Sequence, residues 1–261
     1  MIPFQHTLWG YEIEIPKNWH HRSFNDKDGF AEDPEAFQPG YTGERLGHLL
    51  IHPEWNALQK PVETLWKGHI SKTAKMLGAK TIASSPWQMA GRSGLEVEVA
   101  LPQKSKKRLW AGVLEHGLEV LTFMVLHWKE NRGEFEPLVT NVISSLRFIS
   151  RADQVAATSQ HLPLPPQTTI LDPHRVVDDI EDDRGWQAYG TPYSVGALQA
   201  FYTRELPNFK WEMDQYIPFP NQGNHPFARL TVTREQQTFL VGLLPGTQSP
   251  QAGMIILREM T

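Results

Sequence analysis

The chain consists of two regions with regular hydrophobic patterning, separated by a stretch that has none. From residue 9 to 149, and again after residue 170, apolar residues recur with the periods of strands and helices. Residues 150–170 keep no such period and include the proline-rich run Leu162-Pro163-Leu164-Pro165-Pro166. Proline fixes φ and removes a backbone donor, so this run should be extended and semi-rigid. The pattern predicts a first domain at residues 1–150, a linker at 151–166 and a second domain at 167–261.

In the first region, the alternation of apolar and polar residues predicts an antiparallel sheet. Residues 9–15 place a large apolar side chain at every second position, as in a half-buried strand. Residues 109–115 and 118–128 predict two strands joined by a tight turn at His116-Gly117. Further strands are predicted at residues 29–32, 46–51, 95–101 and 147–149.

Two helices are expected to cover this sheet. Residues 61–77 carry one apolar stripe, begin with a proline suited to the first helical turn and end before Gly78. Between Phe135 and Leu146, apolar residues recur at helical spacing, and Val142 and Ile143 belong to that stripe. Because the apolar face of a sheet must be covered, the region predicts an α+β domain, an antiparallel sheet packed with two helices.

The second region predicts a smaller α+β domain in the order β-α-β-β-β. Ser194 is suited to cap a helix, whose apolar stripe continues to about Glu205 and which Pro207 would end. Candidate strands are found at residues 168–171, 186–189, 211–219, 227–235, 238–244 and 254–258. One helix would therefore pack on an antiparallel sheet.

Composition narrows the classes of function. Of the 261 residues, 40% are hydrophobic and 21% are charged, which is typical of a soluble globular protein. The net charge of -4 argues against general nucleic-acid binding, which needs a basic surface. The absence of cysteine excludes disulfides, thiolate catalysis and cysteine-ligated zinc. No apolar run approaches the roughly 20 residues of a membrane span and no signal-peptide pattern opens the chain, so we expect a cytoplasmic location.

The first region resembles a known superfamily at both of its ends. The segment Trp9-Gly10-Tyr11-Glu12-Ile13-Glu14-Ile15-Pro16-Lys17-Asn18-Trp19 is similar to the strand, proline and tryptophan that open PsbP-like domains. The segment Val142-Ile143-Ser144-Ser145-Leu146-Arg147-Phe148 is similar to the end of their last helix. The PsbP-like superfamily includes the DcrB-like bacterial proteins. The resemblance implies an α/β/α sandwich over residues 1–150 that serves protein binding and offers no catalytic residue.

The second region resembles a small α+β domain of uncharacterised bacterial proteins. The shared features are a Leu-Pro-x-Pro start, a helix ending in Phe201-Tyr202-Thr203-Arg204-Glu205-Leu206 and a strand led by Trp211. This resemblance implies no particular activity.

No motif for catalysis, a cofactor or a metal is recognisable. The chain contains no Gly-x-Ser-x-Gly, P-loop, Gly-x-Gly-x-x-Gly or His-Glu-x-x-His sequence. His20 and His21 would point to opposite faces of a strand, whereas His48 and His52 would lie about 13 Å apart along one. The acidic stretch Asp178–Asp183 resembles the start of a calcium loop but lacks its glycine and closing glutamate, which leaves open whether it binds a cation. We therefore expect no catalytic residue, cofactor or metal site.

Two features of the first region are candidates for binding a partner. The candidate partner-binding residues are Lys104, Lys106, Lys107, Arg108 and Phe123. The four basic residues form a predicted turn that could meet an acidic group, or be a solvated turn that protects strand edges. Phe123 lies on a strand that is apolar on both faces and so needs cover on both. That cover would be a helix of the same domain, the second domain or a foreign partner.

The pattern as a whole predicts a cytoplasmic two-domain protein that binds another protein, as a non-catalytic adaptor or chaperone-like module. The alternative is a small-ligand-binding protein or an enzyme with its site in the cleft between the domains. The nine tryptophans are expected mainly as large core residues, with an aromatic binding surface as the alternative, and their spacing does not separate the two.

Overall fold

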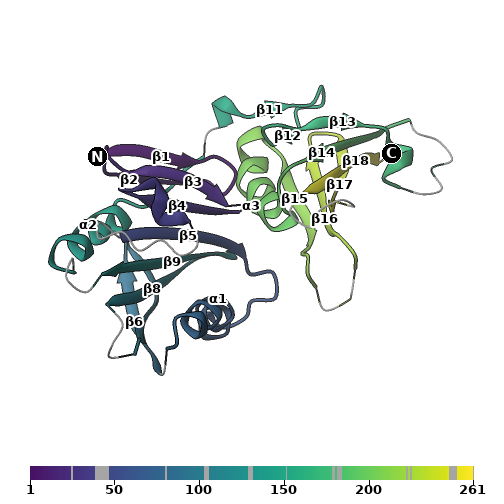
Figure 1. The fold of residues 1–261 in the computed structure, drawn as a ribbon. Coiled ribbons are helices and arrows are strands. Elements are labelled where there is room, and N and C mark those ends of the chain that lie inside the picture. Colours follow the sequence, from purple (N-terminus) through teal and green to yellow (C-terminus); the bar gives the residue numbers. More distant parts are fainter. Residues whose placement is uncertain are drawn as a thin grey trace. The chain divides into compact units, whose positions relative to one another are not determined.

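The protein folds into two compact units, shown by a computed structural model (Figure 1). The first unit comprises Met1–Gln5 and Tyr11–Phe148, and the second comprises His6–Gly10 and Ile149–Thr261. The structure describes residues 1–24, 26–38, 47–79, 81–102, 106–128, 132–150, 152–177, 180, 184–221, 223, 225–246 and 252–260. Lys104 and the five acidic residues of the stretch Asp178–Asp183 lie outside these ranges. In the ranges described, no helix is long and apolar enough to cross a membrane.

The first unit is built on a seven-stranded antiparallel sheet with the spatial order β3-β4-β5-β9-β8-β7-β6. Its strands are β3 (His20–Phe24), β4 (Lys27–Ala31), β5 (Gly47–Trp55), β6 (Thr81–Met89), β7 (Arg92–Ala100), β8 (Lys107–His116) and β9 (Glu119–Trp128). A smaller sheet has the order β1-β2-β10 and consists of β1 (Ile2–His6), β2 (Tyr11–Ile15) and β10 (Arg147–Phe148). Strands β3 and β6 are thus the two edges of the large sheet.

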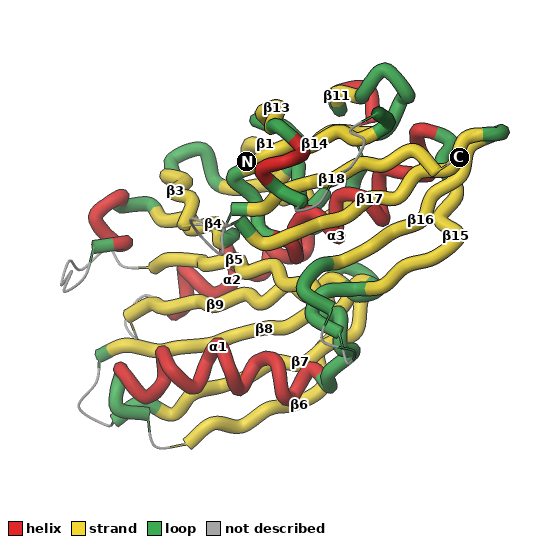
Figure 2. The backbone as a smooth tube through the Cα atoms, turned by 90° about the vertical axis from the view of Figure 1, so that its right-hand side faces the viewer, coloured by secondary structure: helices red, strands yellow, loops and turns green. Residues whose placement is uncertain are grey.

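Two helices lie on opposite faces of the large sheet, α1 in front and α2 behind in Figure 2. Helix α1 (Val62–Met76) packs its apolar stripe against alternate residues of β7, β8 and β9. It follows Pro61 and ends at Met76, two residues before Gly78, whose φ of 70° is one that glycine adopts without strain. Helix α2 (Arg132–Ser144) buries Val142 and Ile143, as the periodicity predicts.

Strand β9 is buried on both faces, so its two-sided apolar pattern is explained within the unit. Val120 and Met124 belong to the cluster beneath α1. Leu121, Phe123 and Val125 alternate with them on the other face, where α2 contacts the strand. Each face of β9 is thus covered by a helix of the same unit, which was one of the alternatives predicted from the sequence.

The second unit is a six-stranded antiparallel sheet with one helix. The spatial order is β13-β14-β18-β17-β16-β15. Its strands are β13 (Thr169–Leu171), β14 (Trp186–Thr191), β15 (Glu212–Ile217), β16 (Ala228–Arg234), β17 (Gln237–Pro245) and β18 (Gly253–Met260). Helix α3 (Val195–Glu205) is capped by Ser194, whose Oγ accepts the Ala197 N–H at 3.3 Å. With this unit, the predicted α+β class is confirmed for both halves of the chain.

Residues of the predicted linker take part in the second unit. Strand β11 (Ala156–Ala157) pairs with β12 (Pro163–Leu164), and Leu162 is fully buried. The Leu162 N–H donates to Thr158 Oγ1 at 3.1 Å, and its C=O accepts the Thr158 N–H at 2.9 Å. The proline-rich run is therefore extended, as expected, and it is also paired.

A loop from the beginning of the chain, His6–Gly10, also belongs to the second unit. Arg204 of α3 donates to the carbonyl oxygens of Thr7 at 3.0 Å and Leu8 at 2.9 Å. The buried Glu205 carboxylate holds the same guanidinium at 2.7 Å. Gly10 has a φ of 64°, and a side chain at that position would collide with Arg204. The second unit is thus assembled from two separate pieces of sequence.

Candidate functional site

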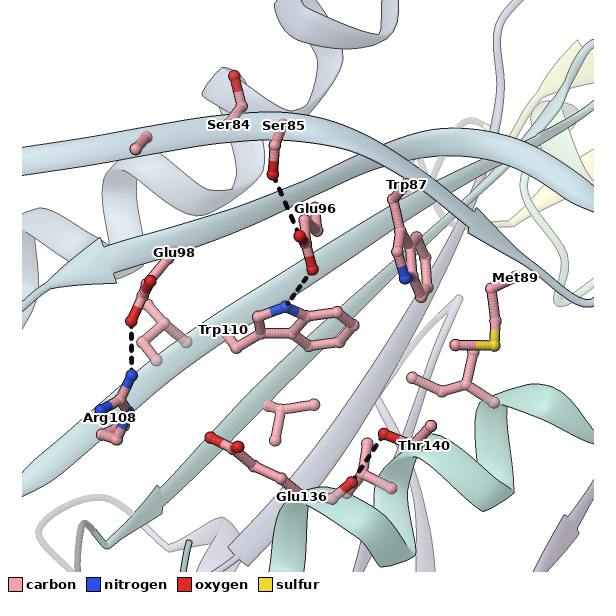
Figure 3. Close-up of a pocket in the computed structure, with 15 residues that line it drawn as sticks. Ser84, Ser85, Trp87, Met89, Glu96, Glu98, Arg108, Trp110, Glu136 and Thr140 are labelled. Carbon is pink, nitrogen blue, oxygen red and sulfur yellow. Dashed lines mark hydrogen bonds and ion pairs between the residues drawn. The ribbon is translucent and has the colours of Figure 1, made fainter.

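A hollow of about 420 Å³ opens on the face of the large sheet that carries α2 (Figure 3). Its lining comes from β6, β7, β8 and β9 and from one side of α2. The helix packs mainly against β9 and β2 and reaches β6 only at Met89, whose Sδ accepts from Ser144 Oγ at 3.2 Å, while residues 83–86 of β6 are exposed. A hollow of this size is in the range of ligand pockets in proteins.

The floor of the hollow becomes more polar from strand to strand. Across the paired strands, Phe123 stands next to Gly112, Gly112 next to Glu96, and Glu96 next to Ser85. Paired residues share one face of a sheet, so this row runs from the core beneath α2 to the edge strand β6. The neighbouring row consists of Val125, Trp110, Glu98 and Ala83. On this face, the apolar rows from the core therefore end at β8, and glutamates follow on β7.

Two tryptophans form the aromatic wall of the hollow. The rings of Trp87 and Trp110 are partly exposed, with their centroids 5.3 Å apart and their planes at 81°. Trp87 reaches from the edge strand over Gly112, where a Cβ would lie only 2.5 Å from the indole. Its ring also meets Phe123 edge to face at 6.3 Å. Gly112 is thus required by the close approach of Trp87, a common reason for glycine inside a strand.

The charged groups of the hollow are mostly carboxylates. Glu96 accepts a hydrogen bond from Ser85 Oγ at 3.1 Å and a long one from Trp110 Nε1 at 3.5 Å. Glu98 pairs with Arg108 at 2.5 Å. Glu136 of α2 lies with its Oε1 3.3 Å from Nε2 of the buried His127. This is an ion-pair distance if the ring is protonated, although the pair does not have hydrogen-bond geometry.

The four candidate partner-binding residues that the structure describes are not gathered on one surface. Arg108 lines the hollow, and Lys106 is exposed just before β8. Lys107 alternates with Arg108 and places its Nζ 5.8 Å from the centroid of the Trp128 ring, on the other face. Phe123 has 0% exposed surface and belongs to the core, so in this fold it does not reach a surface that a partner could contact.

The residues that sequence reasoning missed are Trp87, Trp110 and Glu96. Alternation on β7 indicated that Glu96 lies on one face, but it could not show that this face is half uncovered. The one usable signal was Gly112 inside a strand of large residues, because such a glycine often marks a close approach by another group.

A second cluster of polar groups surrounds the buried carboxylate of Asp28, where β2, β3 and β4 meet. Tyr11 donates its hydroxyl to Asp28, and His21 Nε2 lies 2.7 Å from the other oxygen of the same carboxylate. Ser23 Oγ also reaches this carboxylate, at 3.3 Å. Burial, and then the Asp28 charge, raise the pKa of Tyr11 well above its usual value.

The arrangement of this cluster favours a structural role. Asp28 orients the His21 ring as a carboxylate orients a catalytic histidine, but Ser23 bonds to Asp28 and not to the ring. The Phe4 and Phe30 rings pack against His21, with centroids 4.5 and 5.1 Å away. The cluster thus satisfies a buried carboxylate and ties the small sheet to the edge of the large one.

His48 on β5 is a partly buried base whose ring is neutral at pH 7. Burial, and secondarily the positive charge of Lys107, lower the pKa of His48 from 6.5 to about 4. Its ring centroid lies 6.1 Å from that of Phe37. Across the described residues, no three His, Cys, Asp or Glu side chains come together in a way that could hold a metal ion.

Acidification is expected to destabilise the first unit through His48. Above about pH 6.5 the ring is neutral in the folded and the unfolded chain, so it contributes nothing. Between pH 6.5 and about 4 the unfolded chain binds a proton that the folded one does not. The free energy of unfolding therefore falls by about 1.4 kcal/mol per pH unit, and by roughly 3 kcal/mol in all.

Urea unfolding at pH 7 and pH 4.5 measures this loss. The His48→Gln variant should lose less stability on acidification than the wild type, whereas His20→Gln, at an exposed position, should behave like the wild type. Equal losses for the wild type and His48→Gln would contradict the prediction.

Comparison with known proteins identifies similar folds and no family. No protein-family model and no curated protein matches the sequence. Cyanobacterial PsbP from Synechocystis sp. PCC 6803 is 16% identical and has a TM-score of 0.41, covering 56% of this chain and 91% of its own. The Ran-binding protein Mog1p of Saccharomyces cerevisiae is 8% identical with a TM-score of 0.40, covering 57% and 95%. A Bacteroides thetaiotaomicron protein is 10% identical with a TM-score of 0.38, covering 94% and 87%. The likeness is one of fold alone.

Proposed function

We propose that this chain is a non-catalytic binding or adaptor protein whose first unit receives an extended segment of a partner protein. The segment lies in the hollow between α2 and strands β6–β8. The observation that carries the proposal is the pair Trp87 and Trp110, which stays partly exposed in the hollow beside α2. Aromatic rings of this kind are enriched at binding surfaces, because covering them removes a large apolar area from water.

The position of the hollow suits a polypeptide. It borders β6, an edge of the large sheet, where an extended segment can lie and point alternate side chains into pockets. Pro86 in β6 has no N–H to offer to an added strand. The side chains of the hollow, more than a continuous backbone ladder, therefore supply the contact.

Selection from a displayed peptide library tests the proposal. The full-length wild-type protein should enrich a set of related peptides. The double variant Trp87→Ala/Trp110→Ala should lose them, because it removes the aromatic wall. Trp186→Ala, at a partly buried tryptophan of the second unit, is the matched control and should retain them. Thermal melts of all three proteins establish that they are folded.

Two outcomes would refute the proposal. The double variant could select the same peptides as the wild type, in which case the hollow is not the site. Alternatively, the wild type could select no peptide, a result that would favour the small-ligand hypothesis over protein binding.

A further inference from the structure

We infer that the hollow recognises an arginine side chain of the partner segment, with its guanidinium held by Glu96 beside the two tryptophans. The inference rests on the proposed function and names the chemical group that the site selects. It is carried by the charge of the lining, the partners of Glu96 and the geometry of the rings.

The lining of the hollow has an excess of negative charge. Glu96, Glu98 and Glu136 face it, and Arg108 is its only basic lining residue within the described part of the chain. Arg108 is already paired with Glu98 at 2.5 Å, so its charge is locally balanced. The whole chain has a net charge of -4, which adds to the attraction for a cationic segment.

Among the residues that the structure describes, no cationic side chain bonds to Glu96. Its two hydrogen-bond donors, the Ser85 hydroxyl and the Trp110 indole N–H, are both neutral. These donors fix the carboxylate at the centre of the hollow, between β6 and the Trp110 ring (Figure 3). A half-buried carboxylate held by neutral groups gains most from a ligand that brings a positive charge and hydrogen-bond donors.

The two indoles select the shape of that cation. Trp87 and Trp110 stand at 81° with their centroids 5.3 Å apart, so a ligand beside Glu96 meets aromatic surface on two sides. Tryptophan is the best ring for binding a cation over its face. A guanidinium is flat, stacks on aromatic rings and offers paired N–H groups to a carboxylate, whereas an ammonium is compact and strongly hydrated. Arginine is therefore preferred to lysine.

The size of the hollow indicates that the arginine is part of a chain. A volume of about 420 Å³ exceeds what one guanidinium fills. The remaining space continues toward Met89 and along β6, so residues next to the arginine occupy it. The occupant is thus an arginine-containing peptide segment, not a free guanidinium compound.

A titration followed by NMR of the indole N–H groups tests the inference on the full-length protein. The probes are a short Gly/Ser peptide with one central arginine and the same peptide with lysine or with the neutral isostere citrulline. The arginine peptide should shift the Trp87 and Trp110 signals. Citrulline should weaken binding at least about tenfold, because it removes the charge from the hydrogen bonds. Free arginine amide should bind more weakly than the peptide.

Variants separate Glu96 from the general charge of the protein. Glu96→Gln should weaken binding of the arginine peptide at least about tenfold and leave the affinity for the citrulline peptide unchanged. Glu115→Gln removes the same charge from an exposed position of β8 outside the hollow and should have no effect.

The outcomes distinguish this inference from the proposed function. Equal binding of the arginine and citrulline peptides, no shift with the arginine peptide, or library-selected peptides that lack arginine would each overturn the inference alone. Failure of the library to yield any peptide that depends on the tryptophans would overturn the proposed function with it.

Discussion

Replacing Phe123 with aspartate is expected to unfold the first unit. The side chain has no exposed surface and lies on the central strand of the large sheet, under α2. Removing a buried phenylalanine ring costs about 3–5 kcal/mol, and burying an unpaired carboxylate costs several more. Since domains are stable by only about 5–15 kcal/mol, this sum is enough to abolish folding. Loss of the near-ultraviolet circular dichroism signal and of a cooperative urea transition would report it.

Phe123→Leu is the matched control for this prediction. It keeps the site apolar and leaves a small void, so it should cost only about 1–2 kcal/mol and keep the transition cooperative. A soluble Phe123→Asp variant that melts like the wild type would show that β9 is open on this face. The residue would then return as a candidate for partner binding.

The sequence predicted the elements whose burial repeats with a regular period. Residues 61–77 were predicted as a helix, and α1 spans Val62–Met76. The hairpin predicted at His116-Gly117 is the β8–β9 turn, with Gly117 at a φ of 62°. These elements pack one or two faces into the core, and that burial imposes the regular spacing of apolar residues from which they can be predicted.

The candidate site was missed because its strands are edges or half solvated. Strand β6 carries serines, a glutamine and Pro86, and it shows no alternation, since little of it is buried. Its pairing with β7 places Trp87 and Ser85 in the hollow, and the sequence of residues 81–89 by itself does not predict that pairing. Strand β3 is exposed for the same reason, and its two adjacent histidines gave no pattern.

The domain boundaries illustrate a different limit. Hydrophobic patterning divides a chain into contiguous stretches, so it predicts domains at 1–150 and 167–261, and these boundaries stay a prediction. The loop His6–Gly10 groups with the second unit through backbone carbonyls that Arg204 binds. Backbone acceptors have no side-chain signature, so the sequence carries no sign of that contact.

In the second unit, Gln199→Leu is expected to cause a large loss of stability. Gln199 has 0% exposed surface and joins α3 to the end of β15. Its Oε1 accepts hydrogen bonds from Tyr216 Oη at 2.7 Å and from the Phe219 N–H at 2.8 Å. Its Nε2 donates to the carbonyl oxygens of Phe219 at 2.8 Å and Val195 at 3.2 Å. All four hydrogen-bonding positions of the amide are thus used.

Leucine has a similar volume, so the cost of Gln199→Leu comes from the lost hydrogen bonds and not from a void. The Phe219 N–H and C=O both lose this partner, and each unsatisfied buried group costs about 1–3 kcal/mol, which gives roughly 3–5 kcal/mol in urea unfolding. Gln215→Leu makes the same exchange at an exposed position of β15 and should stay within about 0.5 kcal/mol of the wild type. Tyr216→Phe removes one donor to the same amide, so combining it with Gln199→Leu should cost less than the sum of the single variants. Strict additivity of the two substitutions, or a loss below about 1 kcal/mol for Gln199→Leu, would contradict the prediction. Either result would mean that water replaces the hydrogen bonds that Gln199 makes to Phe219.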